Sequence, residues 1–293
     1  MTERTLALAA AQTNTPTAAR MPHMPKPSVS HDATTMADLL DLEARAFRTR
    51  FKPRTRRQYY AAVATLWNLL DRNIDAAVEK AGCLQGGRMS GSRRALCGTP
   101  FGYMRPAQVD HYSSFVWAKG PQNYCEIGFN GGHGTVAMLL ANPQLNVLSF
   151  DIGGYPYSKV AVQIVSTYFG RRFRYVQGDS HVVVPAHARN RTNRWSCDVL
   201  LVDGDHSAVG SLEDLKNMRI LAKPGAVVLI DDVQEGPGKA LSEAERLNLA
   251  RVESWHTFNR STVGDRHNPC IRRVRPPMWA CHQGWGWAVA RYV

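Results

Sequence analysis

The sequence predicts an α/β fold with a doubly wound, mostly parallel sheet of seven strands and an N-terminal helical cap. Three observations support this. From Asn123 onward, short apolar runs alternate with helix-like segments, which is typical of a parallel sheet covered on both faces. The first run breaks into glycines and then into a helix. The final run, 285–293, has no helix after it, which predicts an antiparallel pairing with the run before it.

Length and composition fit one large α/β domain with an appendage. The chain has 293 residues, of which 44% are hydrophobic. No run approaches the roughly 20 apolar residues of a membrane-spanning helix, so we expect no membrane insertion. Six cysteines without a Cys-x-x-Cys pair predict reduced thiols in a cytoplasmic protein, with neither a zinc site nor a disulfide framework.

The N-terminal 120 residues divide into a tail and a cap. Residues 1–33 are rich in Ala, Thr, Ser and Pro without a periodic apolar pattern, which predicts a disordered tail. Their scarcity of acids also fits an organelle-targeting segment, so import stays open. Residues 34–120 hold two helical patterns, around 36–47 and 59–77, and then a glycine-rich stretch, 82–102, that predicts a long loop over the binding site.

Residues 121–293 form the predicted α/β domain, and each element follows from its pattern. Strands are expected where apolar runs end at Gly or Asp, and helices where apolar residues recur at helical spacing. The expected strands are 123–127, 146–150, 173–177, 198–202, 225–230, 251–258 and 285–293. The expected helices are 134–141, 157–169, 207–221 and 237–249.

The glycine loop after the first strand predicts a nucleotide-type ligand site. Gly128, Gly132 and Gly134 give Gly-x-x-x-Gly-x-Gly, whereas a dinucleotide fingerprint needs Gly-x-Gly-x-x-Gly. Glycines let the backbone approach a ligand, and the start of the next helix offers unpaired amides. A loop of this kind alone can also be a simple tight connection.

Polar residues follow the next two strands of the predicted sheet. Asp151 lies 23 residues beyond Gly128, where a carboxylate can hold both hydroxyls of a ribose. Asp179 and Ser180 follow the third strand, and Asp179 could bond an adenine amine or serve equally well as a turn residue.

Acids converge at the ends of the fourth and fifth strands. Asp203 follows the fourth strand and Asp231 and Asp232 follow the fifth. Carboxylates crowded at one point repel one another, and they suit a hard divalent ion such as Mg²⁺. Asp205 is expected to cap the helix that follows it. His206 can accept a proton near neutral pH, or it can serve as a helix-start histidine without catalytic duty.

These motifs resemble the class I S-adenosylmethionine-dependent methyltransferases, whose motif I the glycine loop matches. Asp203-Gly-Asp-His206 and Asp231-Asp232 resemble the metal-dependent, macrocin-type O-methyltransferases. The resemblance covers about residues 120 to 235. It implies a Rossmann-like methyltransferase fold, Asp203, Asp231 and Asp232 as Mg²⁺ ligands, and His206 with Asp203 in catalysis. The cofactor-binding residues that we predict are Glu126, Gly128, Asn130, Gly132, His133, Asp151, Asp179, Ser180 and Asp203. Catechol-type relatives carry Asn at the position of Asp232, and here the chain departs from them.

The reaction that this predicts is methyl transfer from S-adenosylmethionine to a hydroxyl of a small molecule, assisted by Mg²⁺ or another divalent metal. A formal charge of +12 leaves alternatives: an RNA or protein methyltransferase, or a catalytically silent cofactor-binding protein with a basic RNA-binding surface. The basic clusters lie in separate segments without interleaved aromatic residues, which favours solvated basic faces as the explanation of the charge. An anionic acceptor could be recognised by Arg93, Arg94, Arg272 and Arg273, and Trp279 could wall the acceptor site. Self-association stays open.

Overall fold

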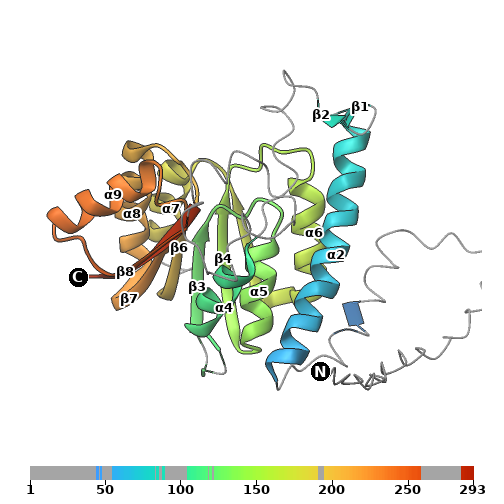
Figure 1. Cartoon of the computed structure of the whole chain (residues 1–293), viewed down its shortest axis with the longest axis horizontal. Helices are drawn as coiled ribbons and strands as arrows, with labels where there is room; N and C mark the ends of the chain where they lie inside the picture. Colours follow the sequence, from blue (N-terminus) through green and yellow to red (C-terminus); the bar gives the residue numbers. More distant parts are fainter. Residues whose placement is uncertain are drawn as a thin grey trace, which may run out of the picture. The chain divides into compact units, whose positions relative to one another are not determined.

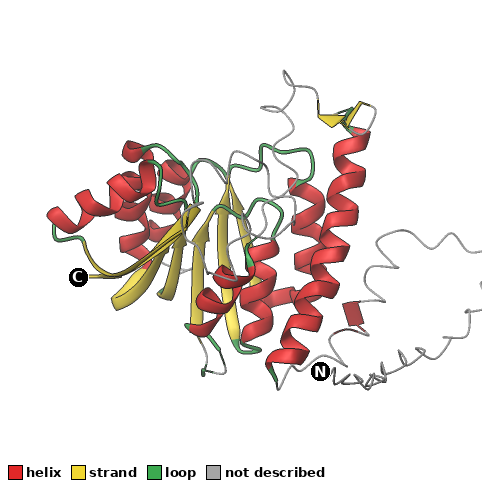
Figure 2. Cartoon of the chain, viewed as in Figure 1, coloured by secondary structure: helices red, strands yellow, loops and turns green. Residues whose placement is uncertain are grey.

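The structure, a computed structural model, contains a seven-stranded sheet with helices on both faces (Figures 1 and 2). It describes residues 44–45, 47, 55–82, 84–85, 88–89, 104–117, 119–120, 122–190, 195–258 and 285–293. The strands of the large sheet are β3 (Gln122–Ile127), β4 (Leu145–Asp151), β5 (Phe173–Gln177), β6 (Cys197–Val202), β7 (Ala222–Ile230), β8 (Ala250–Phe258) and β9 (Trp285–Tyr292).

The strand order is β5-β4-β3-β6-β7-β9-β8, and the strands from β5 to β7 pair in parallel. The last strand, β9, lies antiparallel between β7 and β8. Its antiparallel pairing with β8 is as the sequence predicted. Every expected strand is present within three residues of its expected bounds. The doubly wound α/β prediction is therefore confirmed.

Two helical layers enclose the sheet. One face is covered by α2 (Arg56–Lys80), α4 (Pro106–Ser114), α5 (His133–Ala141) and α6 (Ser158–Phe169), followed by the 3-10 turn η1 (Gly170–Arg172). The other face is covered by α7 (Ser180–Arg189), α8 (Ala208–Leu221) and α9 (Gly236–Arg246). Strand side chains alternate between the two cores: Val199 and Leu201 join the first, and Leu200 and Val202 join the second.

Helix α2 forms part of the expected cap. The Thr55 side chain accepts a hydrogen bond from Gln58 N at 3.2 Å and so caps the helix N-terminus. Eight of its residues, spaced to lie on one side, are buried: Tyr59, Ala62, Val63, Leu66, Leu69, Leu70, Ile74 and Val78. This stripe packs in the same core as α5 and α6, so α2 lies against the helices that flank the glycine loop.

Three local features differ from the sequence expectations. Helix α7 was not expected because Pro185 interrupts its pattern, yet burial of Val184 and a cap from Asp179 sustain it. A small hairpin, β1 (Leu84–Gln85) with β2 (Arg88–Met89), lies within the stretch predicted as a loop. Helix α4 lies in a segment for which no element was predicted. The cap of α8 is Ser207, whose Oγ accepts from Gly210 N at 3.0 Å; Asp205 instead accepts from Ser207 N at 2.7 Å.

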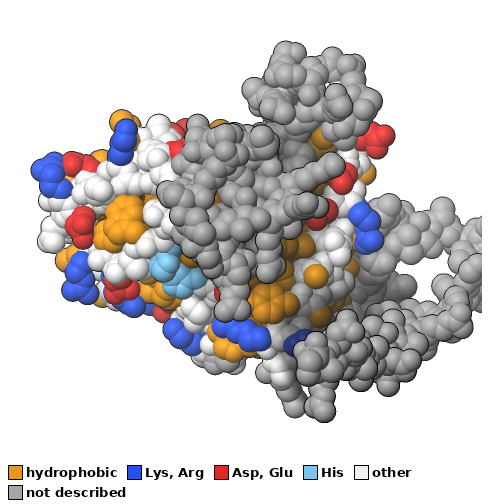
Figure 3. Space-filling view, viewed as in Figure 1, with side chains coloured by type: hydrophobic (Ala, Val, Ile, Leu, Met, Phe, Trp, Pro, Cys, Tyr) orange, Lys and Arg blue, Asp and Glu red, His pale blue; other side chains and the backbone are white. Residues whose placement is uncertain are grey.

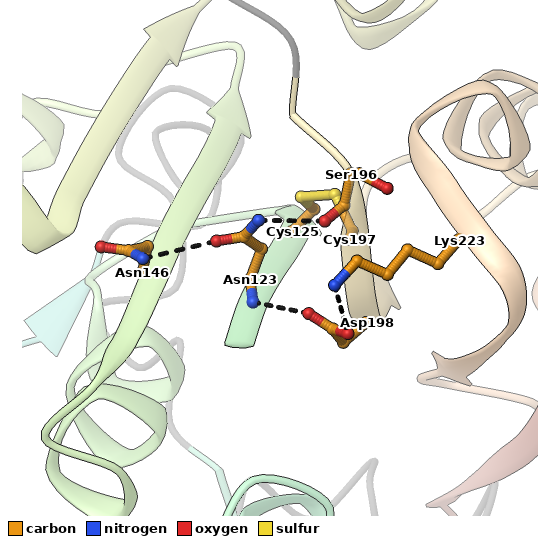
Figure 4. Close-up of a disulfide and its surroundings, with 7 residues drawn as sticks. All are labelled: Asn123, Cys125, Asn146, Ser196, Cys197, Asp198 and Lys223. Carbon is orange, nitrogen blue, oxygen red and sulfur yellow. Dashed lines mark hydrogen bonds and ion pairs between the residues drawn. A yellow bond between two sulfur atoms is a disulfide. The ribbon is translucent and has the colours of Figure 1, made fainter. Parts of the chain in front are cut away.

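A disulfide joins Cys125 on β3 to Cys197 on β6, with their Cα atoms 5.9 Å apart (Figure 4). The prediction that all cysteines are reduced thiols was wrong for this pair. The reason is tertiary, because adjacent pairing of β3 with β6 brings together residues separated by 72 positions. A cross-link closing a loop of that length disfavours the unfolded chain by about 4 kcal/mol in the chain-entropy model.

Several expectations fall outside the described residues. They concern the tail 1–33, four of the cysteines, most of the glycine-rich stretch, Trp279, and the arginines at 93, 94, 272 and 273. Among the described tryptophans near the C-terminus, Trp285 and Trp287 are buried and Trp255 is 44% exposed. No described helix is long and apolar enough to cross a bilayer.

Candidate active site

The carboxyl ends of β3, β4, β6 and β7 meet at one edge of the sheet. Hydrogen bonds extend the ladder past the strands: Gly128 N donates to Phe150 O at 2.9 Å, and Asp203 N donates to Ile127 O at 3.0 Å. Asp231 N likewise donates to Val202 O at 3.2 Å. The residues that the sequence placed after these strands are therefore held side by side by backbone geometry.

Gly128 allows the glycine loop to lie directly against the backbone at the end of β6. Its φ is +97°, and a Cβ there would lie 2.0 Å from the Asp203 carbonyl oxygen. Only glycine tolerates both the left-handed backbone and this approach. At the other end of the loop, Gly132 has a φ of +80° and forms the N-cap of α5. The two glycines thus fix how the loop leaves β3 and enters the helix.

Asp151, predicted to hold a ribose, anchors the glycine loop to β4. Its Oδ2 accepts from Asn130 N at 2.8 Å, and its Oδ1 accepts from Gly153 N at 2.6 Å. Asn130 itself has a φ of +49°, and its Oδ1 accepts from Tyr157 OH at 2.6 Å. A carboxylate has about four acceptor positions, so two backbone amides leave capacity for further donors.

Glu126 and His133, two further predicted cofactor residues, are enclosed by the protein. Glu126 is 1% exposed and accepts a hydrogen bond from Thr135 Oγ1 in the first turn of α5. His133 is also 1% exposed, and its Nε2 lies 2.9 Å from Asp71 Oδ1 on α2. Both side chains therefore fasten the loop to its surroundings.

Asp179 and Ser180 lie at the start of α7. Asp179 Oδ1 accepts from His181 N at 2.9 Å, which is the turn or cap alternative left open by the sequence. Ser180 Oγ donates to Asp214 Oδ1 at 2.6 Å, and Asp214 is fully buried. Both side chains thus have partners within the protein.

Asp203, His206 and Asp232 form the most compact group of ionisable side chains at this edge. One candidate ligand atom from each lies within 4.8 Å of the other two. His206 Nε2 is 3.6 Å from Asp203 Oδ1, and His206 Nδ1 is 3.4 Å from Asp232 Oδ2. Glu235 Oε2 lies 3.7 Å from His206 Nδ1. The imidazole is thus surrounded by three carboxylates.

Asp231, the third predicted metal ligand, has a different environment. Gln108 Nε2 of α4 lies 2.8 Å from Asp231 Oδ1 and 2.9 Å from Oδ2. Asp232 N also donates to Asp231 Oδ1, at 2.9 Å. Gln108 of α4 therefore contacts both carboxylate oxygens of Asp231. The side chain of Asp232, whose φ is +49°, instead points toward His206.

The ionisation of this group reflects burial and crowding of negative charge. Burial, together with the charge of Asp232, raises the pKa of Asp203 to about 6. Burial and the neighbouring carboxylates also hold the pKa of Asp231 well above its usual range. The hydrogen bond with Asp203 and the surrounding acids raise the pKa of His206 to about 9. Within the described residues, the His206 imidazolium is the cation at the centre of the group.

Comparison with known proteins agrees with this geometry. A family model described as a methyltransferase domain matches residues 125–233, which run from β3 to just past Asp232. Residues 125–233 therefore match a methyltransferase domain.

One solved structure with a TM-score above 0.5 shares the fold of this chain, and a second has a TM-score below 0.5. An O-methyltransferase from Bacillus cereus, determined in complex with SAH, is 13% identical with a TM-score of 0.51, covering 88% of this chain and 100% of its own. The O-methyltransferase TomG from Streptomyces achromogenes, determined with SAM, is 11% identical with a TM-score of 0.48, covering 88% and 99%. A comparison with curated protein sequences gives no match.

Two residues that contact the methyltransferase site were missed by the sequence analysis. Gln108 holds Asp231 across 123 positions of sequence, and Asp71 holds His133 across 62. Both lie on helices outside residues 125–233 and outside any recognised motif. A lone polar residue on an amphipathic helix gives no signal of its distant partner.

Glu126 predicts a pH dependence of stability in the methyltransferase domain. Burial raises its pKa from 4.5 to about 7. The folded state therefore binds this proton more tightly than the unfolded state, so the stabilisation is complete below pH 4.5 and is lost as the pH rises through about 7. The full shift corresponds to roughly 3 kcal/mol. We expect the free energy of unfolding, measured by urea titration with EDTA, to fall less between pH 5 and 8 in Glu126→Gln than in the wild type.

Other groups with raised pKa, including Asp203 and His206, titrate in both proteins, so the difference between the two slopes isolates Glu126. Parallel curves for the two proteins would show that Glu126 is not the buried titrating group.

Proposed function

We propose that this protein transfers the methyl group of S-adenosylmethionine to a hydroxyl of a small molecule with the help of a divalent cation. The observation that supports this most directly is the convergence of Asp203, His206 and Asp232 beside the glycine loop. The proposal joins two halves of one sheet edge: a cofactor side at β3 and β4, and an acidic side at β6 and β7.

The acidic side fits a divalent cation. Asp203 and Asp231 have raised pKa values because burial disfavours their negative charges and neighbouring carboxylates repel them, and the charges of His206 and Arg105 offset this only in part. Carboxylate oxygens are preferred ligands of Mg²⁺, and an added imidazole nitrogen also suits Mn²⁺ and related ions. Asp203 and Asp232 would hold the ion, and Asp231 would join them if its contact with Gln108 opened. The ion, when bound, would lower the pKa of an acceptor hydroxyl.

The cofactor side presents the Asp151 carboxylate, the glycine loop and the N-terminus of α5. S-adenosylmethionine carries an electrophilic methyl group on its sulfonium. The protein therefore has mainly to place the two reactants in line. Gly128 packs against the backbone of Asp203, so the glycine loop lies directly beside the acidic side.

His206 is the candidate proton acceptor. In the present arrangement its pKa of about 9 keeps the ring protonated at neutral pH, because three carboxylates stabilise the imidazolium. With those carboxylates neutralised by a cation, the ring can lose this proton. Nε2, the nitrogen nearer Asp203, can then accept the proton of the acceptor hydroxyl.

The acceptor would approach between α4 and the start of β9. There the Arg105 guanidinium lies 4.0 Å from the centre of the Trp285 ring and acts electrostatically on Asp231. A cation stacked on an aromatic ring at this position could meet an anionic group of the acceptor. On the face shown in Figure 3, the described Lys and Arg side chains are interspersed with acidic and apolar ones, which does not favour the RNA-binding alternative on that face.

The experiment is methyl transfer from labelled S-adenosylmethionine into a metabolite extract, with Mg²⁺ or with EDTA. We expect labelled small molecules only when the cation is present. Undiminished labelling in EDTA would refute the role of the cation. Label recovered in RNA or protein would instead establish the corresponding macromolecular methyltransferase, and cofactor binding without any labelled product would indicate a catalytically silent protein.

A further inference from the structure

We propose that α2 acts as a latch that fixes the position of the glycine loop, and that Asp71 is the positioning residue of this latch. The inference rests on the proposed cofactor site and adds a determinant of cofactor affinity that lies outside residues 125–233. Its elements are two contacts from one face of α2 to a single residue, His133.

The two contacts hold different parts of His133. Asp71 Oδ1 lies 2.9 Å from the ring nitrogen Nε2, and Trp67 Nε1 donates to the backbone carbonyl at 2.9 Å. The Trp67 ring also meets the imidazole edge to face, with centroids 5.4 Å apart. Side chain and backbone of one residue are thus both fixed from α2, which leaves His133 little freedom to turn or shift.

His133 occupies the position where the glycine loop becomes α5, directly after Gly132. At its other side the loop is held by the Asp151 and Tyr157 contacts to Asn130. The loop is therefore anchored at both ends. Of these anchors, only the one from α2 lies outside the segment matched as a methyltransferase domain.

The space beside Gly131 is filled by side chains of α2 and of His133. A Cβ at Gly131 would lie 2.9 Å from Ile74 Cδ1 of α2 and 3.0 Å from His133 Nδ1. The loop backbone therefore packs against both α2 and the imidazole ring. If the ring turned, the loop would lose one of the surfaces that define its path.

The contact between Asp71 and His133 matters energetically because the His133 ring is buried. His133 is 1% exposed, and its Nδ1 meets no hydrogen-bond partner among the described residues. Without Asp71, both ring nitrogens would be buried without a partner, which is unfavourable enough to drive the ring to another position. The Asp71 side chain is 48% exposed, whereas α2 itself is seated by its eight buried residues. The effect of removing Asp71 should therefore fall on the loop and not on the packing of the helix.

The test compares Asp71→Ala, Asp71→Asn and Trp67→Phe, with Asp75→Ala as the matched control one turn along the same helix. The probe is S-adenosylhomocysteine, with binding measured by titration calorimetry. We expect Asp71→Ala to bind about tenfold more weakly, the typical effect of losing a hydrogen bond to a charged group. Asp71→Asn keeps an acceptor oxygen and should recover most of the affinity. Trp67→Phe keeps the ring but loses its donor, and it should weaken binding.

Two further measurements separate positioning from general damage. Urea unfolding of the cofactor-free Asp71→Ala and Asp75→Ala proteins should show that both are fully folded under the conditions of the binding measurement. In the labelled-transfer assay, Asp71→Ala should raise the KM for S-adenosylmethionine while leaving kcat at saturation within about twofold. If Asp71→Ala does not fold, Trp67→Phe decides the question by the same binding measurement.

The outcomes distinguish the latch from the function on which it rests. The latch would be overturned if Asp71→Ala and Trp67→Phe both bound S-adenosylhomocysteine with wild-type affinity. It would also be overturned if Asp75→Ala weakened binding as much as Asp71→Ala. In either case the proposed cofactor site would stand. Absence of S-adenosylhomocysteine binding in the wild type would overturn both.

Discussion

Replacing Asp232 by Asn is expected to reduce methyl transfer by roughly 10²- to 10⁴-fold, the range associated with losing several kcal/mol of stabilisation from a bound cation. The substitution removes one of the two carboxylates that would hold the ion and leaves the shape almost unchanged. Asp232 has a φ of +49°, and Asn is among the few residues that tolerate this left-handed conformation. The loss should therefore arise from charge and not from backbone strain.

Two measurements check this expectation. Labelled transfer into extract gives the rate, and the electron paramagnetic resonance of Mn²⁺ gives the affinity for the cation. Binding of S-adenosylhomocysteine should remain at the wild-type level, because Asp232 lies on the acidic side of the edge. Asp205→Asn is the matched control: it neutralises an acid two residues after Asp203 that is not part of the convergent group. Asn keeps a carbonyl oxygen that can coordinate a cation, so unchanged Mn²⁺ binding in Asp232→Asn would show that the charge of Asp232 is not required. Unchanged Mn²⁺ binding in Asp232→Ala would refute the assignment of Asp232 as a ligand.

Replacing Gly128 by Ala is expected to destabilise the fold by about 3–5 kcal/mol and to abolish cofactor binding. Two costs combine at this position. The φ of +97° is unfavourable for a residue with a side chain, and the added Cβ would lie 2.0 Å from the Asp203 carbonyl oxygen and 2.7 Å from its carbonyl carbon. Both obstacles are backbone atoms, so no side-chain rotation can relieve the collision. The loop or the end of β6 must move.

Gly225 provides the control for backbone strain alone. Its φ is +70°, and a Cβ there would meet nothing within 4 Å, so Gly225→Ala should cost only about 1–2 kcal/mol. Urea unfolding measures both variants, and S-adenosylhomocysteine titration follows binding. If Gly128→Ala were no less stable than Gly225→Ala, the close approach of the loop to Asp203 would be refuted.

Much of the fold could be predicted because the relevant signals are local. Apolar runs and helical periodicity located all seven strands of the sheet and five of the helices that cover it. Helix α7 escaped because Pro185 and a run of valines weaken the local helical pattern, and only packing of Val184 and the Asp179 cap outweigh them. The Cys125–Cys197 disulfide escaped because it depends on which strands are neighbours.

The candidate site shows the same division. The rule that ligands bind beyond the carboxyl ends of parallel strands gathered Gly128, Asp151, Asp203, Asp231 and Asp232 from the sequence. It could not say which way each side chain turns. Asp231 and Asp232 are adjacent in sequence, yet one is bound by Gln108 and the other faces His206. Those directions depend on α4 and on the left-handed backbone of Asp232, which no spacing reveals.

The sequence by itself determined the order of elements, the glycine loop and the set of acids at one edge of the sheet, because periodicity and strand termination are properties of short segments. Only the tertiary structure decided that α4 holds Asp231 and that α2 holds His133. Those contacts join residues 123 and 62 positions apart, and the reason they form is that helices seated by their apolar faces carry single polar side chains into the site. Such a side chain acquires its role from what it packs against, and the chain order alone does not contain that information.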